Sequence, residues 1–179
     1  SYMFNTTNKL FEKAEVRRAL ALALDRNAIA QIVTFAKPAT GYVPYKVFDS
    51  KSGTSFREVG GNILSSTADV AGAKSLLSSA GVNGGSFTLS VRNNEVDLAI
   101  ADYVAGVWGA LGFNVTVEAV ETTANSTDPQ NLKVDNFQLL YDSGEFDVIA
   151  IDMMMLSTDA FSALSQFAVS FSGNGVDID

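Results

Sequence analysis

The stretch at residues 86–120, SFTLSVRNNEVDLAIADYVAGVWGALGFNVTVEAV, decides the fold class. Residues 86–91 alternate apolar and polar side chains, which predicts a half-buried β-strand. Residues 95–111 then carry apolar side chains at helical spacing, and Gly112 follows as a stop. Residues 113–120 alternate again and predict a second strand. A strand, a helix and a strand in succession are typical of an α/β domain.

The flanking patterns extend this alternation. We expect two further strands and four further helices, with loops elsewhere, and Asp25 or Asn27 as the cap of the second helix. The strands are predicted over residues 2–6 and 146–151, and the helices over 14–25, 26–35, 66–80 and 159–167. Residues 37–61 carry two of the three prolines and are expected to be an extended segment held down by its aromatic side chains, Tyr42, Tyr45, Phe48 and Phe56. The sequence therefore predicts one α/β domain over residues 1–179, with a mixed sheet packed by helices.

The composition excludes several kinds of chemistry. The chain has 179 residues, of which 47% are hydrophobic and 18% charged, and it contains no cysteine and no histidine. Disulfides, thiolate or imidazole metal sites and Ser-His-Asp triads are therefore excluded. Asp147 and Asp152 could be considered as an acid and base pair, but an offset of five along a strand places them on opposite faces. We expect no enzyme, no metal and no cofactor.

The charge is distributed unevenly along the chain. Residues 1–92 carry 11 basic and 6 acidic side chains, whereas residues 93–179 carry 1 basic and 14 acidic ones. A net charge of −8 without a basic stripe argues against nucleic acid or an anionic membrane as a partner. The sequence has no apolar run long enough to span a bilayer and no leader-like start, and it begins like the middle of a longer protein.

Several short motifs resemble a known family. Phe4-Asn5-Thr6, Leu10-Phe11, the run at residues 15–20 (EVRRAL) and the run at 23–26 (ALDR) occur in order. They are followed by KPATGYVP at residues 37–44, FREVGG at 56–61, the helix pattern at 69–81, LGFNV at 111–115 and FDV at 146–148. Together these resemble the family-5 extracellular solute-binding proteins, the oligopeptide- and dipeptide-binding components of ABC importers.

The resemblance implies a fold and a function. It implies one lobe, the second, of a two-lobe periplasmic-binding-protein-like receptor of type II, which captures a peptide or another small solute in the cleft between its lobes. ABC permease subunits are the implied partners of the complete protein. The implied location is extracellular, lipid-anchored to a Gram-positive cell surface through a segment outside this chain, with the periplasm as the alternative; the lobe itself is expected to be a monomer. The competing interpretation is a surface adhesin or protein-interaction module without a transported ligand.

The loop after the predicted strand at residues 146–151 is the expected ligand site, because open α/β sheets bind ligands beyond the carboxyl ends of their strands. In the family an aspartate of this loop holds the amino terminus of the peptide, and the resemblance aligns Leu156 with it. Three methionines offer a soft apolar surface, or else fill the core, and Asp152 is an alternative acid. Asp159 is expected to cap a helix. The expected substrate-binding residues are Asp152, Met153, Met154, Met155, Leu156 and Ser157.

Overall fold

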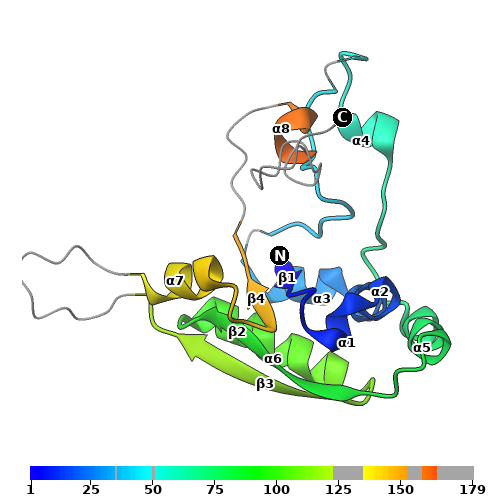
Figure 1. The fold of residues 1–179 in the computed structure, drawn as a ribbon. Helices are drawn as coiled ribbons and strands as arrows, with labels where there is room; N and C mark the ends of the chain where they lie inside the picture. The colour runs from blue at the N-terminus through cyan, green and yellow to red at the C-terminus, as the bar shows by residue number, and fades with distance from the viewer. Residues whose placement is uncertain (35, 50, 123–134, 153–158, 165–179) are drawn as a thin grey trace, which may run out of the picture. The chain divides into compact units, whose positions relative to one another are not determined.

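A computed structural model describes residues 1–34, 36–49, 51–122, 135–152 and 159–164. The chain divides into two compact units (Figure 1). Unit 1 comprises Ser1–Pro38 and Thr67–Asp152, and unit 2 comprises Ala39–Ser66 and Met153–Asp179. Among the described residues no helix has both the length and the hydropathy that a membrane crossing requires.

Unit 1 is built on a four-stranded sheet with the order β1-β4-β2-β3. The strands are β1 (Tyr2–Phe4), β2 (Gly85–Arg92), β3 (Phe113–Val120) and β4 (Val148–Ala150). β2 runs parallel to both β3 and β4, and β1 pairs antiparallel with β4. The expected mixed sheet is confirmed. Because β2, β3 and β4 share one direction, their carboxyl ends meet at one edge of the sheet.

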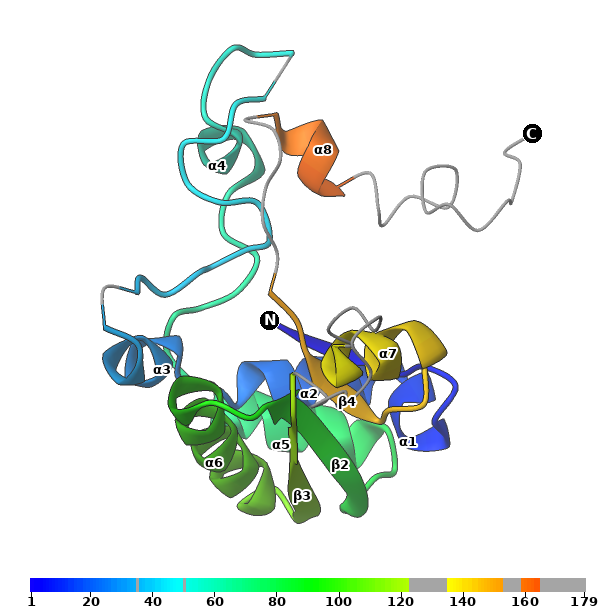
Figure 2. The ribbon, with the colours of Figure 1, turned by 90° about the vertical axis from the view of Figure 1, so that its left-hand side faces the viewer.

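Helices cover the sheet of unit 1 on both faces. α1 (Lys9–Glu12), α2 (Ala14–Leu22), α5 (Val70–Ser79) and α6 (Glu95–Gly109) contribute buried side chains to one core with Phe87, Leu89 and Val91 of β2. α7 (Asn136–Ser143) lies on the other face, where Phe137 covers the alternate residue Arg92 (Figure 2). α3 (Arg26–Ile32) completes the unit and begins at Asp25, whose carboxylate accepts the N–H groups of Asn27 and Ala28, as expected of a cap.

Two short helices of unit 1 differ from the sequence prediction, as does α4 (Phe56–Gly60) of unit 2, which lies in the segment expected to be extended. α1 lies in the expected loop at residues 7–13, and α7 lies where no element was assigned. Each begins at a side-chain cap, Asn8 for α1 and Asp135 for α7, and α7 ends at Gly144 with a positive φ of 68°. Helices this short present too few turns for an apolar periodicity to be recognised. α5 begins at Val70 with Asp69 as its cap, later than the predicted start at residue 66.

Aromatic rings fill the centre of the core. The Trp108 ring lies 5.6 Å from that of Phe87, 5.9 Å from that of Tyr2 and 6.0 Å from that of Phe4. The buried indole N–H donates to the Leu20 carbonyl at 3.0 Å, which satisfies the polar atom of this side chain. Burial raises the pKa of Tyr2, and the nearby Asp97 carboxylate adds to that rise.

Unit 2 has a small core of its own. Val43, Val47, Ala160 and Ala163 are buried, with Tyr42, Phe56 and Leu164 packed against them. Its helices are α4 (Phe56–Gly60) and α8 (Ala160–Leu164). The expectation that four aromatic side chains pin residues 37–61 is wrong for two of them, since Tyr45 is 51% and Phe48 56% exposed. Phe48 instead contributes its backbone, whose carbonyl accepts the N–H of Ala160 at 3.0 Å.

The guanidinium of Arg57 holds this segment together instead. It donates to the carbonyls of Val43 at 2.7 Å, Gly41 at 2.9 Å and Gly61 at 3.2 Å, and it lies over the Tyr45 ring. A Cβ at Gly41 would lie 2.1 Å from an Arg57 nitrogen, so any larger residue there would displace the guanidinium from this contact. The KPATGYVP and FREVGG motifs are therefore two halves of one contact within unit 2.

The core of unit 1 predicts a contrast between two leucines. Leu89 of β2 is fully buried, whereas Leu139 of α7 is 55% exposed. We expect Leu89→Ala to lower the free energy of unfolding by about 2–5 kcal/mol, because it removes buried methyl groups and leaves a cavity. The matched Leu139→Ala variant should change it by less than about 0.5 kcal/mol. Urea denaturation followed by Trp108 fluorescence measures both, and equal losses would contradict the assigned core.

Candidate functional site

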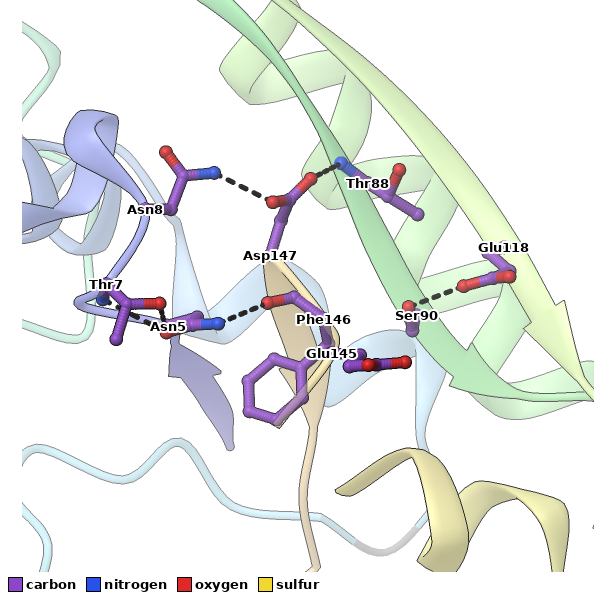
Figure 3. Close-up of a pocket in the computed structure, with 9 residues that line it drawn as sticks. All are labelled: Asn5, Thr7, Asn8, Thr88, Ser90, Glu118, Glu145, Phe146 and Asp147. Carbon is purple, nitrogen blue, oxygen red and sulfur yellow. Dashed lines mark hydrogen bonds between the residues drawn. The ribbon is translucent and has the colours of Figure 1, made fainter. Parts of the chain in front are cut away.

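Asp147 joins three segments of unit 1 immediately before β4. One carboxylate oxygen accepts the side-chain N–H of Asn8 at 2.7 Å, and the other accepts the backbone N–H of Thr88 at 2.9 Å (Figure 3). The β2–β4 ladder begins one residue later, at Leu89 and Val148. The carboxylate therefore takes the place of a backbone acceptor for Thr88 and continues the ladder by one bond.

Asn5 makes the second connection to the same segment. Its side-chain N–H donates to the carbonyls of Gly144 and Phe146, each at 2.9 Å, and its carbonyl oxygen accepts from the Thr7 backbone and hydroxyl. The backbone N–H of Asn5 also donates to the Asp147 carbonyl at 2.9 Å. Thus the FNT and FDV motifs, far apart in sequence, hold each other in place.

These two connections border a polar pocket with a volume of about 510 Å³. Thr88 and Ser90 of β2 and Glu118 of β3 form its floor, on the sheet face opposite the main core. The walls come from the β1–α1 segment and from the segment between α7 and β4 (Figure 3). The complete lining is Asn5, Thr7, Asn8, Thr88, Ser90, Glu118, Glu145, Phe146 and Asp147.

The charged side chains of this lining are all acidic. Asp147 is engaged twice, as described, and Glu118 accepts a hydrogen bond from the buried Ser90 hydroxyl at 2.7 Å. Glu145 also lines the pocket (Figure 3). Within the described ranges no three acidic side chains converge in a way that could hold a metal ion. The lining offers hydrogen-bond acceptors and hydroxyls, which suit the binding of a molecule that forms hydrogen bonds.

The second candidate site is the carboxyl edge of the sheet. β2 ends at Arg92, and Asp152 lies two residues beyond β4. The Arg92 Nε atom lies 3.9 Å from an Asp152 carboxylate oxygen, with the Arg92 side chain 28% and the Asp152 side chain 85% exposed. An ion pair this long and this open to water contributes little to stability. The edge nevertheless presents a cation and an anion side by side.

Phe137 holds the guanidinium of Arg92 from one side. The guanidinium carbon lies 4.1 Å from the centre of the Phe137 ring, which is itself buried. The Arg92 Nη1 atom is also buried and has no hydrogen-bond partner among the described residues. Because buried donors normally have a partner, this nitrogen has unused capacity to bind an acceptor.

The structure places one of the predicted substrate-binding residues, Asp152, at this edge. Asp152 lies at the carboxyl edge as expected, and it contacts Arg92 while Asp147 contacts Thr88, so the two aspartates do not form a pair. Met153, Met154, Met155, Leu156 and Ser157 lie outside the described residues and stay predictions. Asp159 accepts the N–H of Phe161 at 3.3 Å at the start of α8, in keeping with a cap.

Sequence reasoning missed Arg92. The signal was available, because Arg92 follows directly on the predicted strand at residues 86–91 and therefore marks its carboxyl end. The sequence indicated Asn5 only as part of the FNT motif, and Asp147 only as part of the FDV motif and as a rejected acid and base partner of Asp152. Their contact spans more than a hundred residues, which local patterns do not report. Arg17 of the EVRRAL motif donates to the backbone carbonyls of Phe11 and Glu12.

The comparisons with known proteins agree with these motifs. Residues 1–175 match the family model described as bacterial extracellular solute-binding proteins, family 5, middle. The chain belongs to this family. Its members are extracellular solute-binding proteins. No curated protein matches the chain.

Solved structures share the fold. A peptide-binding protein of a peptide ABC transporter superposes with a TM-score of 0.75 at 20% identity, over 93% of this chain and 72% of that one. An oligopeptide ABC transporter substrate-binding domain from Bacillus anthracis str. Ames gives 0.71 at 17% identity, over 92% and 30%. AgaA from A. tumefaciens R10, in complex with agropinic acid, gives 0.67 at 23% identity, over 92% and 30%. The expected type II periplasmic-binding-protein-like fold is confirmed, and the chain spans about a third or less of the length of AgaA and the B. anthracis protein.

Asp147 provides a test of the polar connections. We expect Asp147→Ala to lower the free energy of unfolding by about 1–3 kcal/mol, because the Thr88 N–H and the Asn8 side chain lose their acceptor. Glu145→Ala removes a carboxylate from the same pocket without breaking a hydrogen bond of the described residues and should change stability by less than about 0.5 kcal/mol. Urea denaturation compares the two variants. Equal effects would show that Asp147 acts only through its charge.

Proposed function

We propose that the protein carrying this chain is the substrate-binding component of an ABC importer that captures an oligopeptide or another small solute between two lobes. The observation that carries the proposal is the family match over residues 1–175. The structural relatives include a peptide-binding protein and a protein in complex with agropinic acid, so both ligand classes belong in the proposal. The permease subunits of the importer are the proposed partners.

The ligand would contact unit 1 at the carboxyl edge of its sheet. Two features support this edge: the parallel strands β2, β3 and β4 end there, and Arg92 offers a buried Nη1 donor that no described residue accepts. A carboxylate of the ligand would satisfy that nitrogen. Asp152 would keep the guanidinium oriented, and the loop that begins at Met153 would supply the apolar contacts.

The proposed location follows from the family and from the FREVGG motif at residues 56–61. It is the outer surface of a Gram-positive cell, with lipid anchoring through another part of the protein; the periplasm is the alternative. A surface adhesin or interaction module remains the competing function. Capture of a small ligand distinguishes the two, because only the importer component requires it.

The test uses the full-length protein and a library of short peptides. A bound ligand at a hundred times its Kd should add about 2.7 kcal/mol to the free energy of unfolding, seen as a rise in Tm. For a peptide that binds, amidation of its carboxyl terminus should weaken binding by about ten-fold or more, because the charge-assisted hydrogen bond to Arg92 is lost. Calorimetry of both peptide forms measures the effect.

The matched controls are Arg92→Gln and Arg18→Gln. In Arg92→Gln the free and amidated peptides should bind alike, whereas Arg18→Gln, which removes the same charge from the exposed face of α2, should behave like the wild type. If Arg92→Gln still bound the amidated peptide as much more weakly than the free peptide as the wild type does, the role of Arg92 would be contradicted. A protein stabilised by no peptide or other small solute would contradict the importer function itself.

Leu156 predicts a second property of the ligand. Because a leucine stands where the family carries the aspartate that holds the amino terminus of the peptide, acetylating that terminus should leave affinity unchanged within about two-fold, since no charged partner is lost. Isothermal titration of acetylated and free peptides gives the comparison. A marked loss on acetylation would show that another acid, with Asp152 the first candidate, holds the ammonium group.

A further inference from the structure

The loop between α5 and β2 contains an Asn-Gly step, Asn83–Gly84. Asn83 is exposed, and its carboxamide makes no hydrogen bond with the residues that the structure describes. The backbone N–H of Gly84 likewise donates to none of the described residues. An exposed carboxamide without a hydrogen bond among the described residues therefore adjoins a backbone amide that has no side chain to shield it.

We propose that Asn83–Gly84 is a site of spontaneous deamidation, at which the protein modifies itself with age. The Gly84 amide nitrogen attacks the Asn83 Cγ atom, and the new N–Cγ bond closes a cyclic succinimide. The bond between Cγ and the side-chain nitrogen breaks, and that nitrogen leaves as ammonia with the proton from the Gly84 amide. Water then adds to one of the two ring carbonyls and opens the ring to aspartate or isoaspartate. The only co-reactant is water.

The same chemistry is hindered at other asparagines of the described chain. Their carboxamides are held by hydrogen bonds: Asn5 to Gly144 and Phe146, Asn8 to Asp147, Asn62 to Thr40, Asn93 to Glu121 and Asn94 to Asp97. A carboxamide that is held in this way cannot turn its Cγ atom toward the next backbone nitrogen. Free rotation of the Asn83 side chain is therefore the first distinguishing property of this site.

Asn114 is the matched comparison. It is exposed, like Asn83, but it lies within β3, opposite Ser86 of β2, and is followed by Val115. A β-branched successor shields the attacking nitrogen, and the extended strand resists the backbone rotation that ring closure needs. Gly84 has no side chain to shield its nitrogen, and it lies just before the first residue of β2. The contrast therefore isolates the effect of the following residue and its backbone from that of exposure.

Isoaspartate at position 83 would disturb the entry to β2. It carries the backbone through the side-chain carbon, which inserts a methylene and adds a negative charge. Gly84, with a φ of 138°, packs so closely that a Cβ would lie 2.2 Å from the Gly112 carbonyl oxygen. Since there is no room for extra atoms, the modified loop must move. The movement would first displace Gly85 and Phe113, the first pair of the β2–β3 ladder.

The experiment is a time course of the purified protein that carries this chain, held in mildly alkaline buffer. Peptide mapping by mass spectrometry follows the mass gain that accompanies exchange of NH₂ for OH at each asparagine, and an isoaspartate methyltransferase assay identifies the isomer. We expect Asn83 to react about ten-fold or more faster than Asn114, because glycine leaves the attacking nitrogen unshielded, and its rate should rise with pH as the Gly84 amide loses its proton. The second Asn-Gly step, Asn174–Gly175, lies outside the described residues and is read from its own peptide.

Asn83→Gln is the control for the consequence, because its longer side chain closes the ring far more slowly. Hydrogen exchange of residues 85–92 should become faster in the aged wild type and stay constant in aged Asn83→Gln. If Asn83 stays intact while Asn114 or a hydrogen-bonded asparagine reacts at the same rate or faster, the proposal is overturned. Deamidation at Asn83 with no change in the exchange of β2 would overturn the proposed effect on the sheet.

Discussion

The burial of Trp108 is the interaction on which the rest of unit 1 depends. Its indole N–H donates to the Leu20 carbonyl of α2, and its ring contacts Tyr2 and Phe4 of β1 and Phe87 of β2. One side chain of α6 therefore contacts a helix and two strands that are distant in sequence. Large aromatic side chains bury much apolar surface, and a satisfied indole adds direction to that burial. With Trp108 in place, the orientations of the helix and of the sheet are no longer independent.

The opposite face of the sheet is organised by polar contacts. Asn5 and Asp147 tie the end of β1 to the start of β4, and Asp147 also completes the ladder beside Thr88. β4 has only three residues, too few for its ladder alone to hold it firmly. The side-chain hydrogen bonds of Asn5 and Asp147 therefore hold β4 in place, as the backbone hydrogen bonds of a longer strand would.

Placement of β4 beside β2 brings the functional groups together. Arg92 and Asp152 follow two parallel neighbours, so their side chains meet at one edge. Phe137, on the helix that precedes β4, covers the guanidinium, and one buried nitrogen of that group donates to no described residue. The chain from α7 to Asp152 thus lines the polar pocket and also carries Phe137 and Asp152, which contact Arg92 at the proposed solute site. Stability and recognition share residues here, which is why Asp147 and Arg92 need separate tests.

The sequence by itself determined the strand-helix-strand unit at residues 86–120, the mixed α/β class and the family, because apolar periodicity and contiguous motifs are local properties. It also placed Asp152 at the sheet edge. Only the tertiary structure decided that Arg92 faces Asp152, that Asn8 reaches Asp147 across 139 positions and that residues 136–143 form a helix. Such contacts depend on the direction of neighbouring strands and on side chains that fill one shared space. A pattern read along the chain contains neither.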